Sequence, residues 1–218
     1  KRFNLTAITG SEEIQRRHFL DSLTCLLAFP SGLPSTTVPD EVPLQWWAAN
    51  LRCADVGTGA GFPGLPLKIN FPEMRWTLIE ATAKKVVFLE HIVKTLRLSQ
   101  VEILHARAED VGRLPEHREQ YDVVLGRAVA HLSVLAEYCL PLCRVGGRFI
   151  APKGEEALEE IAASEEAITL LGGTLVAAKP ITLPDVPGQR YVVVMDKIAK
   201  TPDRYPRRAG IPLKRPLP

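Results

Sequence analysis

The sequence has no long hydrophobic run and few cysteines. Across its 218 residues, no stretch approaches the roughly 18 consecutive apolar residues of a membrane-spanning helix. The opening residues Lys1 to Asn4 have no apolar segment behind them, so we expect no signal peptide. Four cysteines in a chain of this length do not predict a disulfide framework. We therefore expect a cytoplasmic protein without a membrane partner.

Metal-ligand patterns are also lacking. The five histidines show no ligand spacing. Cys139 and Cys143 lie in an apolar helical stretch, which is more typical of core thiols than of a metal site. We predict no metal.

What is present is the composition of one packed globular domain. Hydrophobic residues make up 46% and charged residues 24% of the chain, which excludes wholesale disorder. We divide the domain into a helical cap with a proline-rich connector (1–43), a core (44–198) and a basic tail (199–218). The sequence does not begin with Met, so we expect the cap to be incomplete.

The cap and connector carry clear local signals. Residues 11–29 have apolar positions at helical spacing and predict a helix with Ser11 as its cap. Four prolines follow between positions 30 and 43 and mark the connector. We expect Trp46 and Trp47 to pack this connector onto the core.

The charge is distributed unevenly. Residues 197–218 contain seven Lys or Arg and one acid, a balance of +6, whereas the chain as a whole has a net charge of +2. The rest of the chain is therefore acidic, at −4. A strongly basic end favours a polyanionic partner, although a solvated tail would look the same.

Strand and helix patterns alternate through the core. The expected strands are 51–56, 76–80, 101–105, 121–125, 148–151, 174–182 and 190–197, and the main expected helices are 84–98, 132–143 and 155–171. This alternation predicts a mostly parallel α/β sheet with helices on both faces. The last two strands have no helix between them and should pair antiparallel. A seven-stranded, Rossmann-like sheet that ends in such a hairpin is typical of class I S-adenosylmethionine-dependent methyltransferases.

The strongest motif is Asp-Val-Gly-Thr-Gly-Ala-Gly-Phe-Pro-Gly at residues 55–64, directly after the first core strand. Its glycines Gly57, Gly59 and Gly61 allow a sharp turn and the close approach of a ligand. Glu80, at the end of the second strand, is placed to accept both ribose hydroxyls of an adenosine. The motif also fits the dinucleotide pattern G-x-G-x-x-G, so by itself it does not select the ligand.

Three features favour a methyl donor over a nicotinamide. Asp55 stands two residues before Gly57, and Glu109 follows the third strand, where methyltransferases contact adenine. The terminal hairpin replaces the second mononucleotide half of a dehydrogenase.

Other absences restrict the reaction. No Asn/Asp-Pro-Pro-aromatic sequence follows the fourth strand, where methyltransferases of exocyclic amines carry it. No cysteine ends the fourth or fifth strand, as methylation of pyrimidine C5 would require. A site without a base still suits guanine N7, which has an in-plane lone pair and no proton to remove.

Three segments extend the argument from fold class to family. They are Asn4–Ile8 with Arg17–Ser22, Gly57–Lys68, and Tyr205–Pro212 with Lys214–Leu217. Together they closely resemble the bacterial 16S (small-subunit) ribosomal RNA guanine-N7 methyltransferases, the RsmG family, also called glucose-inhibited division protein B (GidB). The resemblance runs from Asn4 to Leu217. It implies methylation of N7 of one guanine in the helix 18 loop of 16S rRNA, with S-adenosylmethionine as the donor.

The resemblance also implies site residues. The expected donor site comprises Asp55, Gly57, Gly59, Gly61, Phe62, Glu80, Ala81, Thr82, Ala108, Glu109 and Arg127. Arg127 would position the reactants, and no residue would act as an acid or base. The RNA-binding candidates are His18, Asp21, Lys153, Arg207, Arg208, Lys214 and Arg215. For His18, Asp21, Lys153 and Arg127, an ordinary structural role stays open.

The expected partner is 16S rRNA, in the small ribosomal subunit or an assembly intermediate of it. We expect a monomer with no obligate protein partner. Two alternatives stay open at this point: a methyltransferase of small molecules or other RNA on the same fold, and an RNA-binding module without catalysis.

Overall fold

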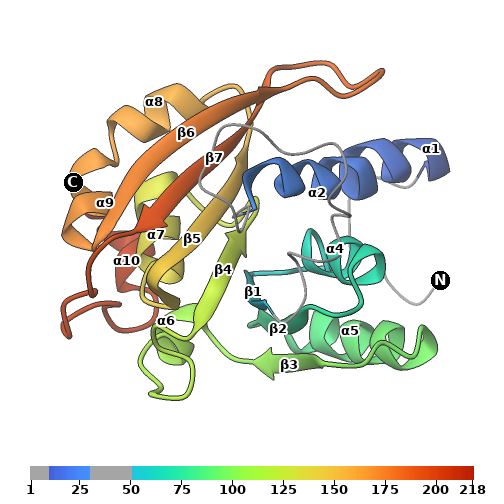
Figure 1. Cartoon of the computed structure of the whole chain (residues 1–218), viewed down its shortest axis with the longest axis horizontal. Helices are drawn as coiled ribbons and strands as arrows, with labels where there is room; N and C mark the ends of the chain where they lie inside the picture. The colour runs from blue at the N-terminus through green and yellow to red at the C-terminus, as the bar shows by residue number, and fades with distance from the viewer. Residues whose placement is uncertain (1–9, 30–50) are drawn as a thin grey trace.

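A computed structural model describes residues 10–29 and 51–218, and in these residues seven strands form one sheet (Figure 1). The strands are β1 (Arg52–Val56), β2 (Arg75–Glu80), β3 (Val101–His105), β4 (Tyr121–Gly126), β5 (Cys143–Lys153), β6 (Gly173–Ile181) and β7 (Arg190–Lys197). The first helix comprises α1 (Ser11–Ile14), η1 (Gln15–Leu20), α2 (Asp21–Leu23) and η2 (Thr24–Ala28). The other helices are α4 (Gly64–Asn70), α5 (Ala83–Thr95), α6 (Ala108–Val111), α7 (Leu132–Cys139), α8 (Ala157–Ala162), α9 (Glu165–Leu170) and α10 (Ile211–Lys214).

The sheet has the order β3-β2-β1-β4-β5-β7-β6. The strands from β3 to β5 in this order pair in parallel, and β7 pairs antiparallel with both β5 and β6. The order reverses between β1 and β4, so a crevice is expected outside the carboxyl ends of these two strands. The predicted fold class, a mostly parallel sheet closed by an antiparallel hairpin, is confirmed.

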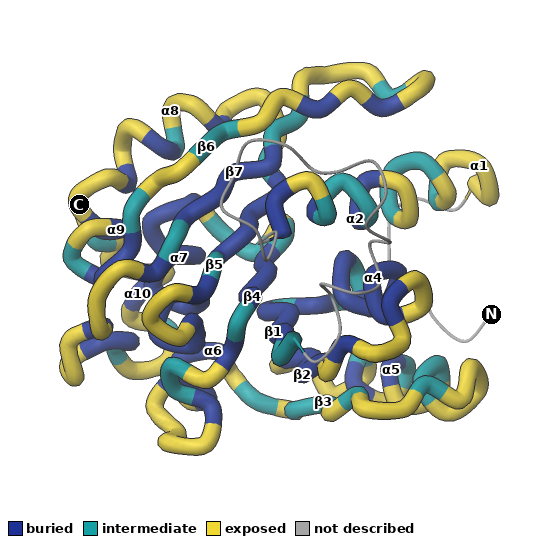
Figure 2. The backbone as a smooth tube through the Cα atoms, in the orientation of Figure 1, coloured by how far each residue is buried: buried dark blue, intermediate teal, exposed yellow. Residues whose placement is uncertain are grey.

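Alternate residues of each central strand supply two hydrophobic cores. Val123 faces the core beneath α4 and the first helix, and its neighbour Val124 faces the core beneath α7, α8 and α9. Both valines are fully buried, as the central strands in Figure 2 are. Because both faces of the sheet are apolar, both must be covered by helices.

The expected elements differ from the structure at a few boundaries. Gly10, not Ser11, precedes the first helical residue. The expected strand 148–151 begins earlier, at Cys143, so Gly146 and Gly147 lie inside β5. A Cβ at Gly147 would crowd three backbone oxygens at 2.9 Å. The β4–β5 register shifts at this point, so the glycines mark a bulge.

The helices on either side of β5 also end differently from the expectation. α7 ends at Cys139, and Cys143 already belongs to β5. The expected helix 155–171 is two helices, with Ser164 between them donating its hydroxyl hydrogen bond back to Glu160 O at 2.6 Å.

Some expectations lie outside the described residues: the Asn4–Ile8 motif, the proline-rich connector and the packing of Trp46 and Trp47. Among the helices that the structure describes, none is long and apolar enough to cross a membrane.

Candidate functional site

The glycine-rich loop follows β1 and is held by Asp55. This side chain is fully buried, and its Oδ2 accepts hydrogen bonds from Thr58 Oγ1 at 2.6 Å and from the Gly64 N–H at 2.9 Å. The two bonds tie the start of the loop to its end. Gly57 has a φ of +66°, and a Cβ there would lie 2.6 Å from Val129, so only glycine fits.

The loop also has two features that suit a small polar ligand. Asp55 Oδ1 is buried and has no hydrogen-bond partner among the described residues. Burial raises the pKa of Asp55 to about 6, although the hydrogen bonds from Thr58 and Gly64 favour the charged form. At Gly59, where φ is +62°, a Cβ would meet no described atom within 4 Å except Gly57 O at 3.9 Å. The residues present therefore fit a ligand that lies along the loop.

Glu80 connects the loop to the end of β2. Its Oε2 accepts the Gly59 N–H at 3.0 Å, and its Oε1 accepts the Thr82 N–H at 2.8 Å. Lys85 Nζ lies 3.7 Å from Oε2. The carboxylate is buried, whereas Ala81 and Thr82 are exposed beside it. Glu80 keeps further lone pairs for a hydroxyl ligand, and its role at a ribose stays a prediction.

Arg127 and Phe62 meet the first helix at the mouth of the loop. The guanidinium carbon of Arg127 lies 5.5 Å from the Phe62 ring centroid, and Nη1 donates to Asp21 Oδ2 at 2.8 Å. His18 stacks on Phe62 with ring centroids 4.9 Å apart, and Phe19 meets the same ring edge-on at 5.2 Å. The fold thus brings Phe62 and Arg127, which are expected at the methyl donor, together with His18 and Asp21. An ordinary structural role had stayed open for both of the latter.

The surroundings of His18 favour its neutral form. Burial and the neighbouring Arg127 charge lower the pKa of His18 below its ordinary 6.5. Arg127 Nη2 lies 3.4 Å from His18 Nδ1. A guanidinium only donates, so Nδ1 accepts and Nε2 carries the proton.

Glu109 links the end of β3 to the C-terminal segment. It is buried with Ala108 in α6, and its Oε1 accepts the Gly210 N–H at 2.8 Å. Because α6 follows a parallel strand, Glu109 lies at the same edge of the sheet as the glycine-rich loop. The expected adenine contact of Ala108 and Glu109 stays a prediction, and the bond to Gly210 was not foreseen.

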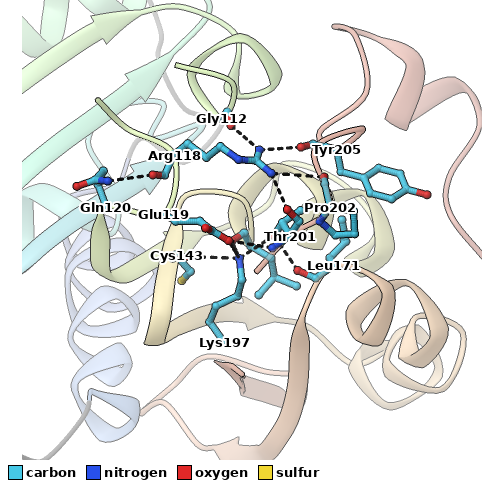
Figure 3. Close-up of polar contacts among 11 residues, drawn as sticks. Gly112, Arg118, Glu119, Gln120, Cys143, Leu171, Lys197, Thr201, Pro202 and Tyr205 are labelled. Carbon is cyan, nitrogen blue, oxygen red and sulfur yellow. Dashed lines mark hydrogen bonds and ion pairs between the residues drawn. The ribbon is translucent and has the colours of Figure 1, made fainter. Parts of the chain in front are cut away.

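Buried polar contacts fasten the beginning of the C-terminal segment to the body (Figure 3). Lys197 Nζ donates to Thr201 Oγ1 and to Leu140 O at 2.6 Å and lies 3.2 Å from Glu119 Oε1. Arg118 donates to the carbonyl oxygens of Thr201 at 2.7 Å and of Tyr205 at 2.8 Å. The basic tail is therefore a packed part of the domain.

Two of the predicted RNA contacts, Arg207 and Lys153, form ion pairs within the protein. Arg207 donates from Nη2 to Glu137 Oε2 at 2.6 Å and from its backbone N–H to Glu137 Oε1 at 2.7 Å, and Glu137 is fully buried. Lys153 donates to Glu160 Oε2 at 2.6 Å and to Ala130 O at 2.8 Å, with a side chain 8% exposed. Both cations are occupied within the protein, so this placement favours structural roles.

The other five candidates fall into two groups. Arg208, Lys214 and Arg215 are exposed, and none forms an ion pair with any residue that the structure describes. Asp21 is buried and belongs, with His18, to the cluster around Phe62. An RNA contact therefore fits the first group better than Asp21.

Sequence reasoning missed Glu137 and Arg190. Glu137 looked like one more residue of an apolar helix, and Arg190 like the start of a strand. Arg190 Nη1 in fact lies 3.2 Å from Asp21 Oδ1, and the two residues are 169 positions apart. No local pattern signals such distant partners.

Comparison with solved structures supports the fold alone. The precorrin-6y C5,15-methyltransferase from Geobacter metallireducens GS-15 matches with a TM-score of 0.58 and 14% identity, over 90% of this chain and 94% of that one. TrmN from Thermus thermophilus matches with a TM-score of 0.56 and 18% identity, over 84% of this chain and 53% of that one.

Sequence comparison is more specific. Residues 1–184 match the family model GidB, rRNA small subunit methyltransferase G. A protein from Roseiflexus sp. (strain RS-1) named Ribosomal RNA small subunit methyltransferase G is 50% identical over 216 residues, covering 99% of this chain and 85% of the relative. One of the same name from Pelotomaculum thermopropionicum is 50% identical over 217 residues, covering 100% and 84%. The chain is therefore a methyltransferase that belongs to the rRNA small subunit methyltransferase G (GidB) family.

Proposed function

We propose that this protein transfers a methyl group from S-adenosylmethionine to N7 of one guanine in the helix 18 loop of 16S rRNA. Its family membership supports methylation of small-subunit rRNA, and the resemblance of its motifs supports the atom and the loop. One structural observation carries the proposal furthest. The Glu109–Gly210 hydrogen bond holds the C-terminal segment against the carboxyl end of β3, the end of the sheet that also carries the glycine-rich loop. This placement supports a donor site and an RNA-binding surface at the same end of the sheet.

The donor site would be formed by the loop and the ends of three neighbouring strands. S-adenosylmethionine, when bound, supplies an electrophilic methyl group on a sulfonium. Gly57, Gly59 and Gly61 let the backbone approach it, and Glu80 receives its ribose. The remaining contacts are assigned to Phe62, Ala81, Thr82, Ala108, Glu109 and Arg127.

The acceptor needs positioning and no general base. Guanine N7 carries a lone pair and no proton, so direct in-line attack on the methyl group requires neither proton removal nor a metal, and orientation supplies the acceleration. A covalent thiolate route is disfavoured because all four cysteines are fully buried. Burial raises the pKa of the Cys143 thiol to about 12 and that of Cys139 well above its ordinary value, so both stay protonated.

The exposed cations of the tail are assigned to the RNA backbone. Arg208, Lys214 and Arg215 carry no competing ion pair among the described residues and can neutralise phosphates. These contacts give affinity and orient the RNA on the protein. Base pairing within the RNA sets the shape of the loop that presents the guanine.

The test is transfer of labelled methyl groups from S-adenosylmethionine to small ribosomal subunits from cells that lack this enzyme, with naked 16S rRNA in parallel. The product is mapped by N7-specific strand cleavage. We expect a single cleavage in the helix 18 loop. Transfer to another position, or no transfer while the protein binds the donor, contradicts the proposal.

Matched variants separate the donor site from the rest of the surface. Arg127→Ala should lower transfer at least about tenfold, because it removes a charged contact of the donor site. Lys94→Ala removes an exposed cation at the far end of α5 and should leave transfer unchanged.

A further inference from the structure

One carboxylate in the first helix is shared by two arginines, one that follows β4 and one in β7. Asp21 Oδ2 accepts from Arg127 Nη1 at 2.8 Å, and Asp21 Oδ1 accepts from Arg190 Nη1 at 3.2 Å. The Asp21 side chain is only 6% exposed, and that of Arg127 only 15%. A buried carboxylate with each oxygen on a different guanidinium is a strong geometric constraint.

The two arginines are fixed by strands that are not neighbours. Arg127 directly follows β4, and Arg190 is the first residue of β7, with β5 between these strands in the sheet. Asp21 therefore ties the first helix across the carboxyl end of β4 and onto β7. In Figure 1 this helix lies over α4, the helix that follows the glycine-rich loop.

The backbone of the first helix is shaped for these contacts. Gln15–Leu20 forms a π-helical segment between two α-helical ones. Within it, His18 and Phe19 both contact Phe62, and the carbonyl oxygen of Arg17 lies 3.4 Å from Arg127 Nη1. Single-turn π segments inside α-helices are frequent at functional sites.

Asp55 is a second carboxylate on which the charge of Arg127 acts. Its Oδ1 is buried and has no partner among the described residues. If Asp21 were neutral, the balance of attraction on the Arg127 guanidinium would shift from the first helix toward the glycine-rich loop.

We propose that Asp21 is a positioning residue for methyl transfer. It holds the Arg127 guanidinium above Phe62, which leaves the donor site free for its ligand and keeps the first helix packed over that site. Asp21 touches neither donor nor RNA in this assignment and acts through Arg127. The inference rests on the proposed use of S-adenosylmethionine.

The test is a double-mutant cycle on donor affinity, measured by isothermal titration calorimetry with S-adenosylmethionine. Asp21→Asn should weaken binding about tenfold or more, since truncating one partner of a buried charge pair is costly. In an Arg127→Ala background the same substitution should change affinity by less than about twofold, because its effect passes through Arg127. Equal factors in both backgrounds, or no effect of Asp21→Asn on a folded protein, overturn the inference.

Two further variants keep the test decisive. Arg190→Ala leaves the Asp21–Arg127 bond in place and should retain donor affinity within about threefold; a loss as large as that of Asp21→Asn would show that docking of the helix alone matters. Should Asp21→Asn fail to fold, Asp21→Glu enters the same cycle. It keeps the charge but displaces it, so a loss of affinity that disappears in the Arg127→Ala background supports the inference, and unchanged affinity overturns it. Failure of the unmodified protein to bind the donor would instead refute the proposed function.

Discussion

Asp55 holds the glycine-rich loop in place, and the burial that this requires makes its carboxyl group harder to ionise. The fully buried carboxylate organises the loop through Thr58 and Gly64, yet one of its oxygens has no partner in the described residues. Its pKa is therefore raised from 3.8 to about 6 in the folded protein. Between these two values the folded state holds a proton that the unfolded state has lost.

The difference between the Asp55 pKa values of the folded and unfolded states predicts how the free energy of unfolding changes with pH. A group with a raised acid pKa favours folding at low pH, and its contribution is lost as pH rises through about 6. Asp55→Asn cannot ionise and should lack this loss. The free energy of unfolding of Asp55→Asn, relative to that of the unmodified protein, should therefore rise by about 2 kcal/mol between pH 4 and pH 7. Urea unfolding at several pH values measures this, and parallel pH profiles for the two proteins would contradict it.

At the scale of elements, the C-terminal segment is held by side chains of the body and not by regular secondary structure. Arg118 and Lys197 fix its beginning, Glu137 holds Arg207, and Glu109 holds Gly210. Only the four residues of α10 are helical in this part of the chain. Its position therefore depends on side-chain hydrogen bonds and ion pairs, some of them buried.

The two neighbouring arginines of this segment should consequently behave differently. Arg207→Ala leaves the buried Glu137 carboxylate without its counter-charge and should lower the free energy of unfolding by about 3 kcal/mol. Arg208→Ala removes an exposed charge and should change it by less than about 0.5 kcal/mol. Urea unfolding of both variants provides the comparison, and equal stabilities would show that the Glu137 pair contributes little.

At the scale of the whole molecule, charge is concentrated where the substrate is proposed to bind. The last 22 residues carry seven of the 27 basic side chains, but Lys197 and Arg207 are used internally. The cations left for RNA in this segment include Arg208, Lys214 and Arg215, all exposed. Affinity from such contacts depends on salt because each releases counterions.

Replacing these three cations by alanine should weaken binding to 16S rRNA and lower the slope of log affinity against log salt by about 2 to 3. Donor affinity should not change, because Arg208, Lys214 and Arg215 are outside the proposed donor site. The control replaces Arg75, Lys94 and Arg97, which are exposed and precede or begin strands at the amino ends of β2 and β3. Filter binding at several salt concentrations distinguishes the two triple variants, and similar slopes for both would move the RNA surface elsewhere.

The sequence by itself determined the sheet and the loop. Hydrophobic periodicity located each strand of the described sheet. β3 and β7 were predicted at their observed bounds, whereas β5 begins at Cys143, five residues before its predicted start. The glycines of residues 57–64 predicted a ligand loop, and Gly57, Gly59 and Gly61 adopt the positive φ that favours glycine. These are local properties, set by residues near one another in the chain.

Only the tertiary structure decided what the charged side chains do. Arg207 and Lys153 resembled exposed RNA contacts in the sequence and are internal ion pairs in the structure. Asp21, with its role left open, bridges Arg127 and Arg190. A charge is internal or exposed according to which distant element packs against it, and the partners here are up to 169 residues apart. Spacing along the chain carries no record of such contacts, because burial and pairing arise only when the layers close on one another.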